Sequence, residues 1–144
     1  MMLRSLTAFG LLVASPGAAW EFTPGVPCLL NHTQSDVTVA LTYDPTGPLY
    51  SIAITRPAPF DAAAVFSMQF SGEAVQSIST NRHEMSNGNR TITVTDIGFG
   101  NVLDGLQFNE TALAILGSQS VAVDLSGAAA PVAAFRACDV QPTA

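Results

Sequence analysis

The stretch VTVALTY, from Val37 to Tyr43, is followed by DPTGPL at 44–49 and by YSIAIT, from Tyr50 to Thr55. In both outer segments large apolar residues alternate with small or polar ones at period two, which predicts two β-strands. Proline near the start of the middle segment and glycine near its end predict a turn. One register, with Tyr43 opposite Tyr50, places all the large apolar side chains on one face, so the sequence predicts an antiparallel hairpin. In that register the further apolar pairs are Leu41 with Ile52 and Val39 with Ile54.

Further alternating segments follow the hairpin. The segment 65–70 places Phe66, Met68 and Phe70 on one face, and we expect it to be a third strand of the same sheet. Strands are also predicted over 75–80 and 91–95, joined through the turn-forming pair Asn87-Gly88. A two-residue turn there would put Ile92 opposite His83 and leave Ile78 on the other face. We therefore expect a longer loop or a bulge that brings Ile78, Ile92 and Val94 together.

The C-terminal part carries different signals. The segment 103–108 is predicted to be a short strand, and Asn109 looks like the N-cap of a helix over Thr111 to Leu116 that stops at Gly117. Another strand is predicted over 121–125. Pro131 is expected to open a final helix in which Val132, Phe135 and Cys138 share a face. The predicted fold class is mainly β, an antiparallel β-sandwich or partly open barrel with one or two short C-terminal helices.

The N-terminus has the features of a targeting segment. Residues 1–19 combine the basic Arg4, an apolar run over Leu6 to Ala14 and small residues before Trp20, which is the order of a secretory signal peptide. The apolar run is too short to span a bilayer, so we do not expect an integral membrane protein. The prediction is cleavage before Trp20, a periplasmic or secreted location, and a single disulfide-stapled domain over 20–144.

The chain has two cysteines, Cys28 and Cys138. In an oxidising compartment paired thiols normally form a disulfide, and neither residue has a metal-ligand or catalytic partner at a suitable spacing. We expect the two cysteines to be bonded to each other, which would pin the two ends of the domain together.

Composition excludes several classes of function. The 144 residues include eleven acids and five basic residues, all of them arginine, which gives a formal net charge of -6. Nucleic-acid binding depends on clustered Lys and Arg and is not expected. Without lysine, P-loop and Schiff-base chemistry lack an essential residue. His32 and His83 stand in no metal-ligand spacing, so no metal and no cofactor are predicted.

The most polar constellation gathers near the Asn87-Gly88 turn and in the loop that follows residue 96. Arg82 is a candidate to bind an anion, and His83 is a candidate binding residue beside it. The competing interpretation is a solvated hairpin end with weak surface ion pairs. Asp96 and Asp104 are also candidates for the paired carboxylates of a glycoside hydrolase. The predicted binding residues are Arg82, His83, Asp96, Asn101 and Asp104.

Four segments carry a resemblance to a known family. They are DIGFGNVLDGLQFN at 96–109, AFRAC at 134–138, WEF at 20–22, and Cys28. In these segments the chain resembles a family of small secreted alphaproteobacterial proteins whose motifs have no assigned activity. Relatives sometimes carry an excinuclease ABC label, which belongs to a large cytoplasmic DNA-repair ATPase that this short chain without a P-loop lysine does not resemble. In plan, the chain is also similar to invasion-associated locus B proteins, which are small exported β domains.

These observations favour a non-catalytic exported domain that binds an envelope protein or a small ligand through a sheet edge or the 96–105 loop. One alternative is an inhibitor of a cell-wall-degrading enzyme, because acidic loops suit a basic target. Another is an envelope hydrolase that uses two of the carboxylates. The sequence leaves the ligand and the oligomeric state open.

Overall fold

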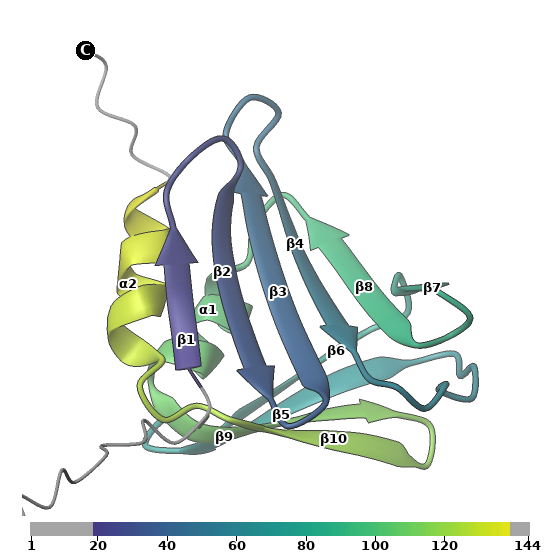
Figure 1. Ribbon diagram of the computed structural model, residues 1–144. Helices are drawn as coiled ribbons and strands as arrows, with labels where there is room; N and C mark the ends of the chain where they lie inside the picture. The colour runs from purple at the N-terminus through teal and green to yellow at the C-terminus, as the bar shows by residue number, and fades with distance from the viewer. Residues whose placement is uncertain (1–18, 139–144) are drawn as a thin grey trace, which may run out of the picture.

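A computed structural model describes residues 19–138, which form two antiparallel sheets and two helices (Figure 1). The six-stranded sheet has the order β1-β2-β3-β4-β8-β7 and consists of β1 (Ala19–Thr23), β2 (Cys28–Gln34), β3 (Val37–Asp44), β4 (Leu49–Thr55), β8 (Thr91–Asp96) and β7 (Glu84–Ser86). The four-stranded sheet has the order β10-β9-β5-β6 and consists of β10 (Gln119–Asp124), β9 (Asn109–Leu116), β5 (Phe66–Gly72) and β6 (Gln76–Thr80). The helices are α1 (Gly100–Gln107) and α2 (Ala129–Ala137). The predicted mainly β, sandwich-like fold is confirmed, and the two sheets do not close into a barrel.

The β3–β4 hairpin is confirmed in its predicted register. Tyr43 of β3 pairs with Tyr50 of β4, and the buried pairs Leu41 with Ile52 and Val39 with Ile54 follow. The turn is fixed by Asp44, whose Oδ1 accepts hydrogen bonds from the Thr46 hydroxyl at 2.6 Å and the Thr46 backbone N–H at 3.0 Å. Both bonds favour the carboxylate, the hydroxyl bond more, and hold the pKa of Asp44 below its ordinary value.

The expected third strand of that sheet is wrong in its placement. The strand exists as β5, with its alternate apolar residues buried, but it pairs with β6 and β9 in the second sheet. Segment 56–65 carries the chain across, held by the buried Phe60 and by Arg56, whose guanidinium stacks on the Phe60 ring at 3.8 Å. Period-two alternation tells which face of a strand is buried and not which sheet the strand joins.

The connection between β6 and β8 also differs from its prediction. A longer loop is present, but it contains the short strand β7, in which Met85 pairs with Ile92 of β8. Ile78 stays behind on β6 in the other sheet. Ile92 and Val94 lie on β8, so the three residues expected to meet on one sheet face are divided between two sheets.

The elements predicted over 103–116 are exchanged in the structure. A helix, α1, occupies most of the segment predicted to be a strand, and a strand, β9, occupies the segment predicted to be a helix. Asn109 is no helix cap, since its side-chain amide bonds the backbone N–H and carbonyl of Ala74 and the carbonyl of Gly105. The residues Asn-Glu-Thr at the start of β9 resemble a helix N-cap and first turn. The segment forms a strand instead, and its side chains are buried with a period of two.

The C-terminal helix and the disulfide are confirmed. Val132 and Phe135 of α2 are buried, and Cys138 is bonded to Cys28 at the start of β2. The helix begins at Ala129, two residues before Pro131. Because α2 packs beside β1 and β2, the bond ties the last described residues to the first sheet (Figure 1).

Polar side chains join the two sheets along the side where β1 faces β10. Gln34 donates from Nε2 to the Ala122 carbonyl at 3.1 Å, and its Oε1 accepts from the Asp124 N–H at 2.7 Å. The same Oε1 lies 3.2 Å from Nε2 of the buried His32, which therefore carries its proton on Nε2. Trp20 stacks on His32 with ring centroids 4.3 Å apart and donates to the Asp124 carbonyl at 3.0 Å.

The carboxyl group of Asp124 closes the turn after β10. It accepts hydrogen bonds from the backbone N–H of Ser126 at 2.9 Å and from the Ser126 hydroxyl at 2.7 Å. These bonds, the backbone one foremost, hold the pKa of Asp124 below its ordinary value. We call the group formed by Trp20, His32, Gln34 and Asp124 the seam.

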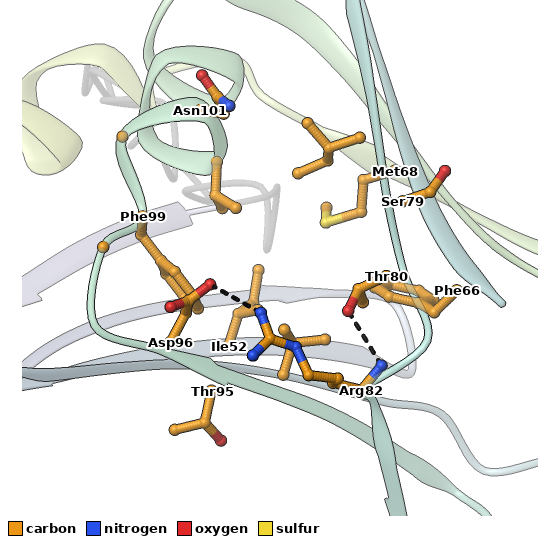
Figure 2. Close-up of a pocket in the computed structure, with 15 residues that line it drawn as sticks. Ile52, Phe66, Met68, Ser79, Thr80, Arg82, Thr95, Asp96, Phe99 and Asn101 are labelled. Carbon is orange, nitrogen blue, oxygen red and sulfur yellow. Dashed lines mark hydrogen bonds and ion pairs between the residues drawn. The ribbon is translucent and has the colours of Figure 1, made fainter.

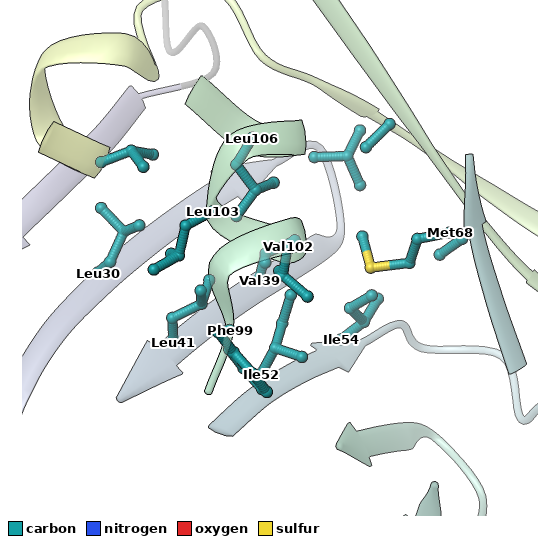
Figure 3. Close-up of a cluster of buried hydrophobic side chains, with 14 of the residues drawn as sticks. Leu30, Val39, Leu41, Ile52, Ile54, Met68, Phe99, Val102, Leu103 and Leu106 are labelled. Atoms are coloured by element: carbon teal, nitrogen blue, oxygen red, sulfur yellow. The ribbon is translucent and has the colours of Figure 1, made fainter. Parts of the chain in front are cut away.

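Helix α1 lies between the two sheets and is buried on both sides (Figure 3). Leu103 and Val102 face the apolar side chains of the first sheet, which include Leu41 and Ile52. On the opposite side Gly105 lies against Phe70 of β5, so closely that a Cβ atom built on Gly105 would be 2.5 Å from the ring. A glycine is required here because the helix backbone touches a fully buried aromatic ring.

We predict that Gly105→Ala lowers the free energy of unfolding by about 1–3 kcal/mol, because the added methyl group forces the Phe70 ring out of a packed core. Gly100→Ala, in the same helix, is the matched control, since nothing lies within 4 Å of its Cβ position. Urea denaturation of both variants is the measurement. An unchanged urea midpoint for Gly105→Ala would contradict the prediction and show that the Phe70 ring can move to accept the methyl group.

We predict that Gln34→Ala lowers the free energy of unfolding by about 1–3 kcal/mol, because the substitution leaves the buried His32 N–H and the Asp124 N–H without their acceptor. Gln69→Ala, at an exposed position on β5, should change the free energy of unfolding by less than about 0.5 kcal/mol. Thermal and urea unfolding of the pair test this. Equal stabilities would mean that the seam does not hold the sheets together.

Candidate functional site

A half-enclosed hollow of about 470 Å³ lies between the sheets at the side opposite the seam (Figure 2). Both sheets and the start of α1 contribute to it, and we call it the inter-sheet hollow. Its wall is mainly apolar and is formed by Ile52, Phe66, Met68, Ile78, Val94, Phe99 and Val102. Its polar lining consists of Ser79, Thr80, Arg82, Thr95, Asp96 and Asn101, together with Gly98 and Gly100.

The strand pairing explains why the hollow is open. β7 pairs only with Thr91 to Thr93 of β8, so Val94 to Asp96 have a neighbouring strand only on the β4 side. On the other sheet β6 pairs, among the described residues, with β5 alone. The inward residues Val94 and Ile78, which a closed sandwich would bury, remain only half-buried. The hollow is therefore the space between two incompletely paired strands.

One ion pair lies at the mouth of the hollow. The Arg82 guanidinium is 3.8 Å from Oδ2 of Asp96, with 79% and 42% of the two side chains exposed (Figure 2). The backbone N–H of Arg82 donates to the Thr80 hydroxyl at 3.0 Å, and Oδ1 of Asp96 accepts from the Ile97 N–H at 2.7 Å. Such an exposed pair contributes little to stability, so both charged groups are available to a ligand.

A second polar contact lies at the start of α1. Gln76 of β6 donates from Nε2 to the backbone carbonyl of Asn101 at 2.6 Å. This bond links the edge strand of the second sheet to the first turn of the helix. The ring of Phe99, which precedes the helix, stacks on Tyr50 with centroids 5.4 Å apart and completes the apolar wall. The 96–102 segment is thus held in place on both sides.

The five residues predicted as a binding site do not all meet. Arg82, Asp96 and Asn101 line the inter-sheet hollow. His83 is turned away and lies with Nε2 2.9 Å from the Ala63 carbonyl, beside the Phe66 ring. Asp104 is on the other face of α1, where its Oδ1 accepts from the Arg136 guanidinium at 2.7 Å.

The apolar wall was not predicted from the sequence. The polar candidates were chosen as a cluster of polar residues in the sequence, whereas the wall combines inward residues of β4, β5, β6 and β8 with Phe99 and Val102. The grouping of Ile78 with Val94 was the one available signal, since both do line the hollow, although from opposite sheets. Finding the site from sequence required knowing which strands belong to which sheet.

The lining of the hollow does not contain the predicted pair of carboxylates. Asp96 is the only carboxylate among them, and Asp104, the proposed partner for glycoside hydrolysis, is paired with Arg136 instead. Within residues 19–138 no three His, Cys, Asp or Glu side chains gather closely enough to hold a metal ion. Neither of the two described helices is long and apolar enough to cross a membrane.

Comparison with known proteins adds no relative: no family model, no curated protein and no solved structure matches this chain.

We predict that Arg82→Ala changes the free energy of unfolding by less than about 0.5 kcal/mol, because its ion pair is exposed. Arg136→Ala should lower the free energy of unfolding by about 1 kcal/mol or more. Its side chain is only one-third exposed, and its guanidinium pairs with Asp104 and donates to Gln107 at 3.0 Å. Urea denaturation compares the two arginines directly. A larger loss for Arg82→Ala would assign the mouth of the hollow a structural role.

Proposed function

We propose that this protein is a non-catalytic exported binding domain and that its ligand occupies the inter-sheet hollow. The observation that carries the proposal is the hollow itself, a space of about 470 Å³ with an apolar wall and a few polar groups at its mouth. Ligand sites in proteins typically measure about 300–1,000 Å³ and combine an apolar lining with a small number of placed polar groups. The inter-sheet hollow has both properties.

The energetics of the hollow support the same proposal. Ile78 and Val94 leave apolar surface partly exposed in a concave site, and covering such surface stabilises a complex by roughly 25 cal/mol per Å². Arg82 and Asp96 have no buried partner that they would have to give up on binding. A ligand therefore gains apolar contact without breaking a strong internal interaction.

Export is supported by the order of residues 1–19 and by the disulfide. The signal-peptide prediction falls almost wholly outside the described residues, of which Ala19 is the first. Ala19 pairs with Thr33 at the start of β1, while Trp20 belongs to the seam. Cleavage before Trp20 thus removes one exposed residue from β1 and keeps every residue of the seam. The bond between Cys28 and Cys138 fits an oxidising compartment, so the periplasm or the exterior is the proposed location.

The test of export is the mass of the protein recovered from a bacterial envelope fraction. We expect a chain that begins at Trp20 and has lost two hydrogens to the disulfide. A full-length, reduced chain confined to the cytoplasm would contradict the proposed location.

The test of binding is a screen of small apolar and amphipathic fragments against the isotope-labelled protein by NMR. Ligands should shift the amide signals of Val94, Phe99 and Asn101. Val94→Trp, which fills the hollow, should abolish these shifts, whereas Thr93→Trp should keep them because the side chain of Thr93 faces the other side of the sheet. Shifts that persist unchanged in Val94→Trp, or a screen without ligands, would contradict a binding site in the hollow.

A further inference from the structure

We infer that the occupant of the inter-sheet hollow is an extended peptide segment, which adds to β6 as a fifth strand of the second sheet and directs alternate apolar side chains into the hollow. The inference rests on the proposed function, since it names the class of ligand for the same site. Its basis is the hydrogen-bonding capacity of the β6 edge together with the position of that edge beside the hollow.

The sheet edges of the described chain differ in how they are protected. The β1 edge has α2 packed beside it. On β10, side chains of the seam bond the Ala122 carbonyl and both the N–H and the carbonyl of Asp124. β7 is only three residues long and begins with the charged Glu84. These three edges offer little to a further strand, and the open part of the β8 edge, Val94 to Asp96, is only three residues long and ends in the charged Asp96.

β6 is different from the other edges. Its five residues, QSIST, pair with β5 on one side, and on the other side no strand and no turn of residues 19–138 bonds its backbone. The strand contains no charged residue, no proline and no bulge, which are the features that usually protect an edge from pairing with another chain. A row of unsatisfied N–H and C=O groups is complementary to an extended peptide backbone and to few other ligands.

The hollow lies where the side chains of such a peptide would point. Side chains alternate across a sheet, and a neighbouring strand runs about 4.8 Å away. Ile78 faces inward from β6 and lines the hollow, so a peptide residue beside it directs its side chain into the hollow, whose wall includes Val94 and Phe99. An apolar cavity of about 150 Å³ accommodates one benzene ring. The inter-sheet hollow, at about 470 Å³, has room for more than one apolar side chain.

The charges at the site favour a neutral peptide. The lining contains one cation, Arg82, and one anion, Asp96, which already face each other. A strongly acidic ligand would be repelled by Asp96 and a strongly basic one would compete with Arg82. Peptide carbonyl groups remain good acceptors for the exposed Arg82 guanidinium. We therefore expect specificity for uncharged segments with apolar residues at every second position.

The experiment uses seven-residue peptides, acetylated and amidated, with serine at odd positions and valine, leucine, isoleucine, phenylalanine or methionine at even positions. A second pool has the same composition with the apolar residues placed side by side. Affinity selection on the folded, disulfide-bonded protein, followed by mass spectrometry, should enrich the alternating pool about tenfold over the rearranged pool. Val94→Trp should remove the enrichment, and Thr93→Trp should retain it.

Backbone N-methylation of the best peptide tests whether binding occurs by strand addition. Alternate amides of an added strand face β6, so methylation of one alternate set should weaken binding about tenfold or more while the other set stays within about twofold. This comparison leaves the protein unaltered, and misfolding of a variant cannot mimic the result. Equal effects of the two sets would overturn strand addition.

The remaining outcomes separate the inference from the proposed function. If decanol or decanoate occupies the hollow in the wild-type protein and the alternating peptides do not bind, the peptide inference is wrong and the binding site stands. If neither binds, both fail. A concentration-dependent dimer that excludes the peptides would place a second copy at β6 and would also overturn the inference.

Discussion

The contact between α1 and the two sheets governs the architecture. Two sheets packed directly on each other lie about 10 Å apart, and a helix with its side chains is itself about 10–12 Å wide. A helix between the sheets therefore separates them wherever it is present. At Gly105 the helix backbone touches Phe70 of β5, while Val102 and Leu103 face the first sheet, so the gap is filled there. Beyond the start of the helix the sheets remain apart, and this is where the inter-sheet hollow lies.

The two sides of the sandwich accommodate this separation differently. On the seam side, hydrogen bonds from Gln34 and Trp20 join β10 to the first sheet, and α2 with the Cys28–Cys138 bond covers β1. On the hollow side the corresponding polar connections are the exposed ion pair between Arg82 and Asp96 and the bond from Gln76 to the Asn101 carbonyl. The stabilising interactions are thus concentrated away from the hollow. A protein whose only task was to be stable would gain by burying Ile78 and Val94 as well, and this one leaves them partly exposed.

Sequence reasoning succeeded where the determining interactions are local. The β3–β4 register followed from side-chain alternation and turn chemistry, and α2 followed from its apolar spacing. It failed where distant contacts decide. Asn109 and Thr111 carry helix-start signals, but β9 is the central strand between β5 and β10, and sheet pairing outweighs a capping preference worth about 1 kcal/mol. For the same reason only the polar part of the site was predicted. Arg82, Asp96 and Asn101 can be recognised in the sequence as polar residues. The apolar wall depends on how β6 and β8 face each other across the two sheets.

The unprotected β6 edge lies on the hollow side, away from the stabilising interactions of the seam. Natural sheets protect a long edge with charges, prolines, bulges or a covering element, because an exposed edge invites pairing with other chains. Here the other long edges are covered, whereas β6, whose Gln76 side chain bonds the first turn of α1, has no charge, proline or bulge over its five residues. The formal net charge of -6 disfavours close approach of two copies of the chain. A net charge that disfavours self-association, together with one unprotected edge, is consistent with the neutral partner strand that we propose.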